Sequence, residues 1–236
     1  MNTVVSAVKL HLNQRRGTFL TPLLITGIVA VVSVLISLIF WRAGSQPGSP
    51  AWVLSSQSNP GIVYALGGFL VYFGVASVAM TYPFALTLGC TRRGFVLGTL
   101  VWEAVVSAYV AVVFLVLNGL EQATDHWFVG FYVFDIYVLG AGDPWRLLAT
   151  VFLGVLGFLA VGGVFAASWV RFGSRGPQLL AIGLLVAIGI TLILIVPDLG
   201  TIFAGFQLWW LAVAAGVVIL LAFAGTWLFL RTAVVR

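Results

Sequence analysis

Few side chains in this sequence have the types and spacing that chemistry at a protein site requires. The two histidines, His11 and His126, and the single cysteine, Cys90, cannot by themselves build a metal cluster, a thiol redox pair or an internal disulfide. The sequence has no HExxH pattern, no serine and histidine paired within an apolar stretch, and no GxxxxGK[ST] loop to cradle ATP phosphates. We therefore expect no enzyme activity, no metal site and no directly bound cofactor. Any dependence on ATP must come from a separate chain.

Glu103 is the one acidic residue inside a long apolar stretch. It lies roughly 13 Å along a helix that begins near Gly94. A carboxylate at that depth in a bilayer costs on the order of 2.5–3.5 kcal/mol, so it should face protein or water and not lipid. Two interpretations remain open. Glu103 either contacts a substrate on a pathway or fixes helix packing through a hydrogen bond, for example to Ser77 or Ser107.

The composition dictates the elements that carry these residues. Of 236 residues, 62% are apolar and 7% are charged, and the mean hydropathy is +1.17, which excludes a soluble globular domain. A membrane-spanning helix needs roughly 20 apolar residues. We predict an all-α integral membrane protein that consists of an interfacial helix at 1–17 and a single six-helix domain at 18–236. The predicted spans are 19–41, 61–80, 94–117, 147–170, 179–196 and 208–230.

The positions of the charges predict the orientation of the spans. The net charge is +5 and the sequence pI is about 9.9. In the six-span layout nine of the 11 Lys and Arg residues fall on one side, and lysine and arginine accumulate in cytoplasmic loops. Both termini are therefore expected in the cytoplasm of a multi-pass cytoplasmic-membrane protein. The placement of lysine and arginine in cytoplasmic loops explains the positive net charge, so nucleic acid is not an expected partner.

The first seventeen residues are predicted to form a short amphipathic helix on the inner leaflet. Val4, Val5, Val8 and Leu12 share one helical face, and Lys9, Arg15 and Arg16 supply positive charge for anionic lipid. The alternative is a frayed basic tail.

Two connections lie on the extracellular side of the predicted layout, and their compositions differ. Residues 43–60 are rich in Ser, Pro, Gly and Gln, which predicts a loop. Residues 118–146 carry a cluster of aromatic residues among four acids, which favours a segment resting on the outer leaflet, because aromatic rings favour the headgroup level. An exit-side lid or a binding site for an extracellular partner is the alternative. The clustered aromatic residues are Trp127, Phe128, Phe131, Tyr132, Phe134 and Tyr137.

The most informative cytoplasmic stretch is 82–95, YPFALTLGCTRRGF. Pro83 disfavours simple continuation of the second span, Gly89 permits a tight turn, and the Thr91 hydroxyl can cap the third span. Between these residues lies a short apolar turn beside two cations, which suggests a docking element for another protein. The alternative, a loop whose arginines reach anionic lipid, leaves the apolar residues unexplained. The predicted docking residues are Phe84, Ala85, Leu86, Leu88, Arg92 and Arg93.

The layout of the chain resembles a known family. Six spans with both ends inside, a basic N-terminal helix, the run at 82–95 and the RFGSRG sequence at 171–176 are similar to the permease subunits of type-2 ABC exporters, particularly small actinobacterial members. In that family the segment between spans two and three is a coupling helix seated in a cleft of the nucleotide-binding subunit, a role that falls here to residues 84–93. The chain between spans five and six often forms short re-entrant helices, and 197–207 fits a short version.

The resemblance implies partners and a function. We expect a permease subunit that exports a hydrophobic or amphipathic substrate, powered by separate ATPase subunits that bind ATP and magnesium. Because six helices are few for a pathway, a second copy or a related permease is expected beside it in the bilayer. Secondary contacts with the ATPase are expected at Arg15, Arg16, Arg171 and Arg175. The alternative from another class is a regulatory, sensor or immunity protein that transports nothing.

Overall fold

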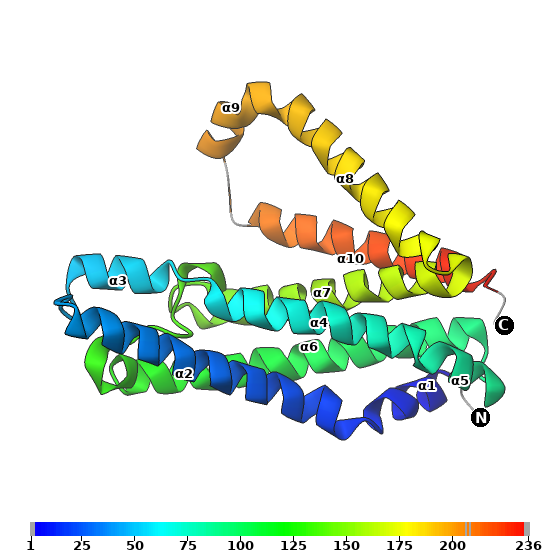
Figure 1. The fold of residues 1–236 in the computed structure, drawn as a ribbon, viewed down its shortest axis with the longest axis horizontal. Coiled ribbons are helices and arrows are strands. Elements are labelled where there is room, and N and C mark those ends of the chain that lie inside the picture. The colour runs from blue at the N-terminus through cyan, green and yellow to red at the C-terminus, as the bar shows by residue number, and fades with distance from the viewer. Residues whose placement is uncertain (1–2, 206, 208, 234–236) are drawn as a thin grey trace. The chain divides into compact units, whose positions relative to one another are not determined.

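The computed structural model describes residues 3–205, 207 and 209–233, and within these ranges the ordered elements are all helical (Figure 1). Short π-helical turns, η1 (Arg16–Leu20) and η2 (His126–Gly130), and short 3-10 helical turns, η3 (Tyr137–Leu139) and η4 (Val196–Asp198), lie between the α-helices. The α-helices are α1 (Thr3–Leu12), α2 (Thr21–Arg42), α3 (Pro50–Gln57), α4 (Gly61–Ala79), α5 (Thr81–Thr87), α6 (Arg92–Ala123), α7 (Pro144–Phe172), α8 (Arg175–Ile195), α9 (Leu199–Ala204) and α10 (Trp209–Leu230).

Six helical segments in the described residues are long and apolar enough to cross a membrane, which confirms the predicted all-α, multi-pass class. They contain α2, α4, α6, α7, α8 and α10, at the places where the sequence predicts spans. Pro22 lies at the beginning of α2, where the missing N–H costs little. In the most apolar stretch of α8 no residue is buried. That helix must therefore be covered by lipid or by another chain.

Residues 43–60 are not the simple loop that the sequence predicts, because they contain α3. Ser49 caps this helix by accepting a hydrogen bond from the Trp52 amide at 3.3 Å, and Pro50 occupies its first turn. A serine N-cap followed by proline is a regular helix-start signal. The prediction was wrong here because turn-forming composition was given more weight than the order of Ser49 and Pro50.

The structure divides into two compact units. Unit 1 comprises the described residues of Met1–Leu10, Val71–Leu100 and Leu159–Arg236, and unit 2 comprises His11–Leu70 and Val101–Phe158. The predicted six-span domain is thus distributed over both units, and α4, α6 and α7 contribute residues to each.

Unit 1 is held by close backbone approach between α4 and α7. A Cβ added to Gly162 would lie 2.2 Å from the Val71 carbonyl oxygen, and one added to Gly74 would lie 2.2 Å from the Leu159 carbonyl oxygen. Small residues at such positions let helices pack closely in a bilayer. Tyr82 and Phe95 are fully buried in the same unit, with their rings 5.2 Å apart.

The N-terminal helix packs against α6 at Ala7, which is not among the predicted apolar-face residues, and at Val4 and Val8, which are. Within unit 1, a Cβ on Gly98 of α6 would lie 2.5 Å from the Ala7 Cβ, so α1 and α6 touch at this point. Ala7 is buried, whereas Val5, one of the predicted apolar-face residues, is 47% exposed. Lys9 is exposed, as expected for a charge beside water or lipid headgroups.

In unit 2, His11 is buried and stacks on Trp102 with ring centroids 4.8 Å apart. Burial lowers the pKa of His11 from 6.5 to about 4, so the imidazole is neutral at physiological pH. Phe19 also packs edge-on against Tyr109 at 5.0 Å. These ring contacts fix the chain before α2 along the middle of α6.

Candidate functional site

The predicted coupling segment forms a distinct helix in unit 1. Helix α5 follows α4 after one residue, Met80, and ends in a tight turn at Gly89, whose φ of +78° favours glycine. Thr91 then caps α6 as predicted, since its hydroxyl accepts a hydrogen bond from the Gly94 amide at 3.0 Å. A short helix is thereby held between two longer ones (Figure 1).

One face of α5 and its following turn anchors the segment. The Tyr82 hydroxyl, from a fully buried side chain, donates to the Leu230 carbonyl at 2.9 Å. Ala85 is 2% exposed and belongs with Tyr82 to one cluster of buried residues, and Leu86 packs against this cluster. Burial raises the pKa of the Cys90 thiol, which therefore remains a protonated, poorly nucleophilic group. Ala85 and Leu86, two of the six predicted docking residues, thus serve mainly to hold α5 on its own unit.

The opposite face of this segment is free in the described structure. Phe84 is 53% exposed and Leu88 is 66% exposed, and Thr87 between them is also exposed. These residues, with exposed Arg93, define what we call the α5 face. Apolar side chains displayed next to cations at a helix turn are typical of a protein contact.

Several chain segments meet at the α5 end of unit 1. Arg92 donates to the Arg231 carbonyl at 2.5 Å, and the Cys90 thiol donates to the Thr3 carbonyl at 3.5 Å. The beginning of α1, the connection from α4 to α6 and the end of α10 therefore lie together. Chain segments that meet on one side of a membrane must be separated by an even number of membrane-spanning helices. The six-span layout satisfies this condition, with two spans before the α4–α6 connection and four after it.

The predicted secondary cations are placed differently. Arg171 donates to the Leu228 carbonyl at 3.2 Å and its guanidinium lies 4.7 Å from the Phe172 ring centroid, so it is engaged within unit 1. Arg175, at the first residue of α8, is exposed. Arg15 and Arg16 are exposed too, but they belong to unit 2.

Glu103 is almost completely buried in unit 2, at 1% exposure. Its Oε2 atom has no hydrogen-bond partner among the described residues. The two serines predicted as possible partners of the Glu103 carboxyl group donate to backbone carbonyls instead. The Ser107 hydroxyl donates to the carbonyl of Glu103 itself, and the Ser77 hydroxyl donates to the carbonyl of Gly74. A buried carboxyl oxygen without a partner is costly, which makes this position a candidate for a polar ligand or water.

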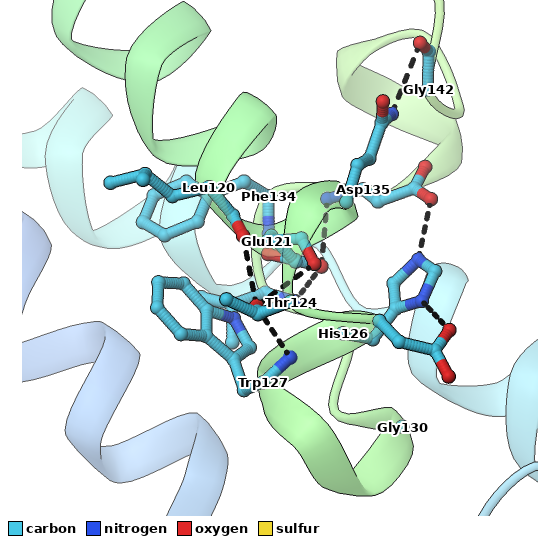
Figure 2. Close-up of polar contacts among 12 residues, drawn as sticks. Leu120, Glu121, Thr124, His126, Trp127, Gly130, Phe134, Asp135 and Gly142 are labelled. Carbon is cyan, nitrogen blue, oxygen red and sulfur yellow. Dashed lines mark hydrogen bonds and ion pairs between the residues drawn. The ribbon is translucent and has the colours of Figure 1, made fainter.

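Unit 2 contains a second polar cluster, which sequence reasoning missed (Figure 2). Glu121 is fully buried near the end of α6, and its carboxyl oxygens accept three consecutive backbone amides. The amides are those of Val133, Phe134 and Asp135, at 3.0, 2.8 and 3.3 Å. This arrangement, which we call the Glu121 clamp, folds the chain after α6 back onto its own helix.

The turn held by the clamp has an unusual backbone. Four consecutive non-glycine residues, from Asp125 to Phe128, have φ between 49° and 66°. Such left-handed conformations cost roughly 1–2 kcal/mol per residue. Partners on both sides support the turn: His126 Nε2 lies 3.0 Å from Asp135 Oδ2, and the Trp52 indole donates to the Gly130 carbonyl at 2.7 Å.

The aromatic residues of the 118–146 segment differ in exposure. Phe131 and Phe134 are buried, at 4% and 2% exposure, whereas Phe128 is 83% and Tyr137 is 51% exposed. The Tyr132 ring packs against His126 in a tilted arrangement, with the ring centroids 4.0 Å apart. The segment is thus a compact cap that presents only some of its rings.

Comparisons with protein-family models, with curated proteins and with solved structures found no match to this chain.

Proposed function

We propose that the chain is the membrane subunit of an ATP-driven exporter of the ABC type, with the α5 face as the docking site for a separate ATPase subunit. The observation that carries the proposal is the exposure of Phe84 and Leu88 on a short helix whose other face is anchored by Tyr82 and Ala85. A rigidly held apolar pair, in a segment that is followed by the exposed Arg93, suits a cleft in a soluble partner. It also offers a mechanical connection from that partner to the long helices α4 and α6.

The size of the contact can be worked from the exposures. Burying a whole Phe or Leu side chain is worth about 1.5–3 kcal/mol, and roughly half of each side chain remains to be buried here. The pair therefore contributes about 2–3 kcal/mol, equivalent to roughly 30- to 150-fold in the dissociation constant. Arg93 can add a charge-assisted hydrogen bond at the edge of the contact.

Co-purification tests the proposal. The tagged chain, isolated from its native membrane in mild detergent, should bring with it a protein that contains a GxxxxGK[ST] loop, identified by mass spectrometry. Phe84→Ala combined with Leu88→Ala should lower recovery of that protein at least ten-fold. The bundle should remain folded, because both side chains point away from the core of unit 1.

A matched control removes equally exposed apolar side chains elsewhere. Ile28 and Ile39 of α2 are 62% and 67% exposed, and Ile28→Ala with Ile39→Ala should leave recovery unchanged. Equal recovery in all three proteins would place docking elsewhere on the chain. Absence of any such ATPase would favour a membrane regulatory or immunity protein.

The transported substrate in this proposal is hydrophobic or amphipathic, and Glu103 is its polar contact within the bilayer. The buried Oε2 without a recorded partner supports that role. Glu103→Gln should lower substrate-stimulated ATP hydrolysis by the complex while leaving its assembly intact. Unchanged hydrolysis with a lower melting temperature would instead assign Glu103 to helix packing.

The same proposal pairs the chain with a second permease in the cytoplasmic membrane. Helix α8 has no buried residue in its most apolar stretch, and the corresponding stretch of α2 is only 6% buried. A second copy or a related permease would cover part of this surface, and lipid the rest. ATP and magnesium would bind only to the ATPase subunits.

A further inference from the structure

Unit 1 contains an apolar cavity of about 480 Å³ between three helices. Its lining is entirely apolar, and the residues are Val71, Val75 and Ala79 of α4, Phe165, Ala166 and Trp169 of α7, and Pro177 of α8. A site without polar groups gives water no hydrogen-bond partners. The natural occupant of such a space in a membrane protein is hydrocarbon.

The shape of the cavity suits a chain. The three residues of α4 are spaced at intervals of four, so they lie on one helical face and extend about 12 Å along its axis. At the α8 end, a Cβ on Gly176 would lie 2.3 Å from the Ser168 carbonyl oxygen, so α7 and α8 are pressed together there. The cavity is therefore elongated along the helices and begins beside the α7–α8 turn.

That turn supplies an interfacial and a charged group. Trp169 lines the cavity yet is 56% exposed, and indoles favour the headgroup level of a bilayer. Arg175 directly precedes Gly176 and is exposed, whereas Arg171 is already engaged with the Leu228 carbonyl. The exposed Arg175, two residues before the lining residue Pro177, is complementary to the anionic headgroup of a lipid whose acyl chain fills the cavity.

We propose that this cavity binds one acyl chain of an anionic phospholipid from the surrounding bilayer, with the lipid phosphate at Arg175. The inference concerns the chain alone and does not depend on the ATPase partner.

Native mass spectrometry of the chain released from nanodiscs tests this binding. Nanodiscs with equal amounts of phosphatidylglycerol and phosphatidylcholine should yield wild-type protein that retains one phosphatidylglycerol in about five-fold excess over phosphatidylcholine. Arg175→Gln should bring this ratio close to one. Ala79→Phe should lower retention of both lipids at least ten-fold, because the phenyl ring occupies the space of the chain.

The control is Ala187→Phe, which adds the same ring at an exposed position of α8 and should behave as wild type. Equal retention of the two lipids by wild-type protein would overturn the headgroup assignment. Equal retention by Ala79→Phe and Ala187→Phe, both melting at the wild-type temperature, would overturn the cavity assignment. If Ala79→Phe fails to fold, Arg175→Gln still decides, because a ratio unchanged by loss of that exposed side chain contradicts the proposal.

Discussion

Replacement of Glu121 by glutamine should open the cap that follows α6. The carboxyl group accepts three buried amides, with one oxygen bonded to Val133 and Asp135 and the other to Phe134. A glutamine keeps one acceptor oxygen and puts an NH2 group, which cannot accept, in place of the other. At least one amide then loses its acceptor, at a cost of about 1–3 kcal/mol, equivalent to roughly 5- to 150-fold in local opening. Glu121→Ala removes all three acceptors and should have the larger effect.

Hydrogen exchange measured by mass spectrometry on the 129–139 region, with the chain in nanodiscs, reports this opening directly. Gln122 provides the matched control, because it is exposed and its side chain donates to the Gly142 carbonyl at 3.2 Å. Gln122→Ala should change exchange by less than about three-fold, since exposed groups contribute little. Wild-type protection of residues 133–135 in Glu121→Gln would refute the view that the clamp holds the cap.

Three further predictions concern packing, pH and orientation. Gly162→Ala should destabilise the bundle by about 1–3 kcal/mol in thermal unfolding, because its Cβ would meet backbone atoms of α4, whereas Gly154→Ala, which has open space, should not. The pKa of His11 is about 4 in the folded chain and 6.5 in the unfolded chain, so between pH 6.5 and pH 4 the unfolded chain binds a proton that the folded chain does not. The free energy of unfolding should therefore be highest above pH 6.5 and fall as the pH approaches 4. The loss reaches about 3 kcal/mol, and His11→Phe should abolish this slope in melting temperature. Ser55→Cys should react with a membrane-impermeant thiol reagent in intact cells and Arg175→Cys should not; the reverse pattern contradicts cytoplasmic termini.

The helical class and the number of candidate spans could be predicted from the sequence because they depend on local composition. A run of about 20 apolar residues has few alternatives to a spanning helix. The turn at Gly89 and the cap at Thr91 could be predicted for a similar reason, since each depends on the residue itself and its neighbours.

The parts that could not be predicted depend on contacts between residues far apart in the chain. The inward orientation of Ala85 follows from packing within unit 1, and the burial of His11 follows from its position on Trp102. The Glu121 clamp joins a helix end to amides twelve to fourteen residues later. Glu121 is an acid four residues after the predicted span 94–117 and is followed within a few residues by many aromatic residues, and that pattern was the available signal.

The docking claim is tested most directly by site-specific photocrosslinking in native membranes. A photoreactive phenylalanine analogue at position 88, which is exposed on the α5 face, should form a covalent product with a protein that contains a GxxxxGK[ST] loop. The same analogue at position 39, an equally exposed apolar site on α2, should not form that product. If position 88 yields no such product while the chain is correctly inserted, or yields the same products as position 39, the α5 face is not the ATPase docking site.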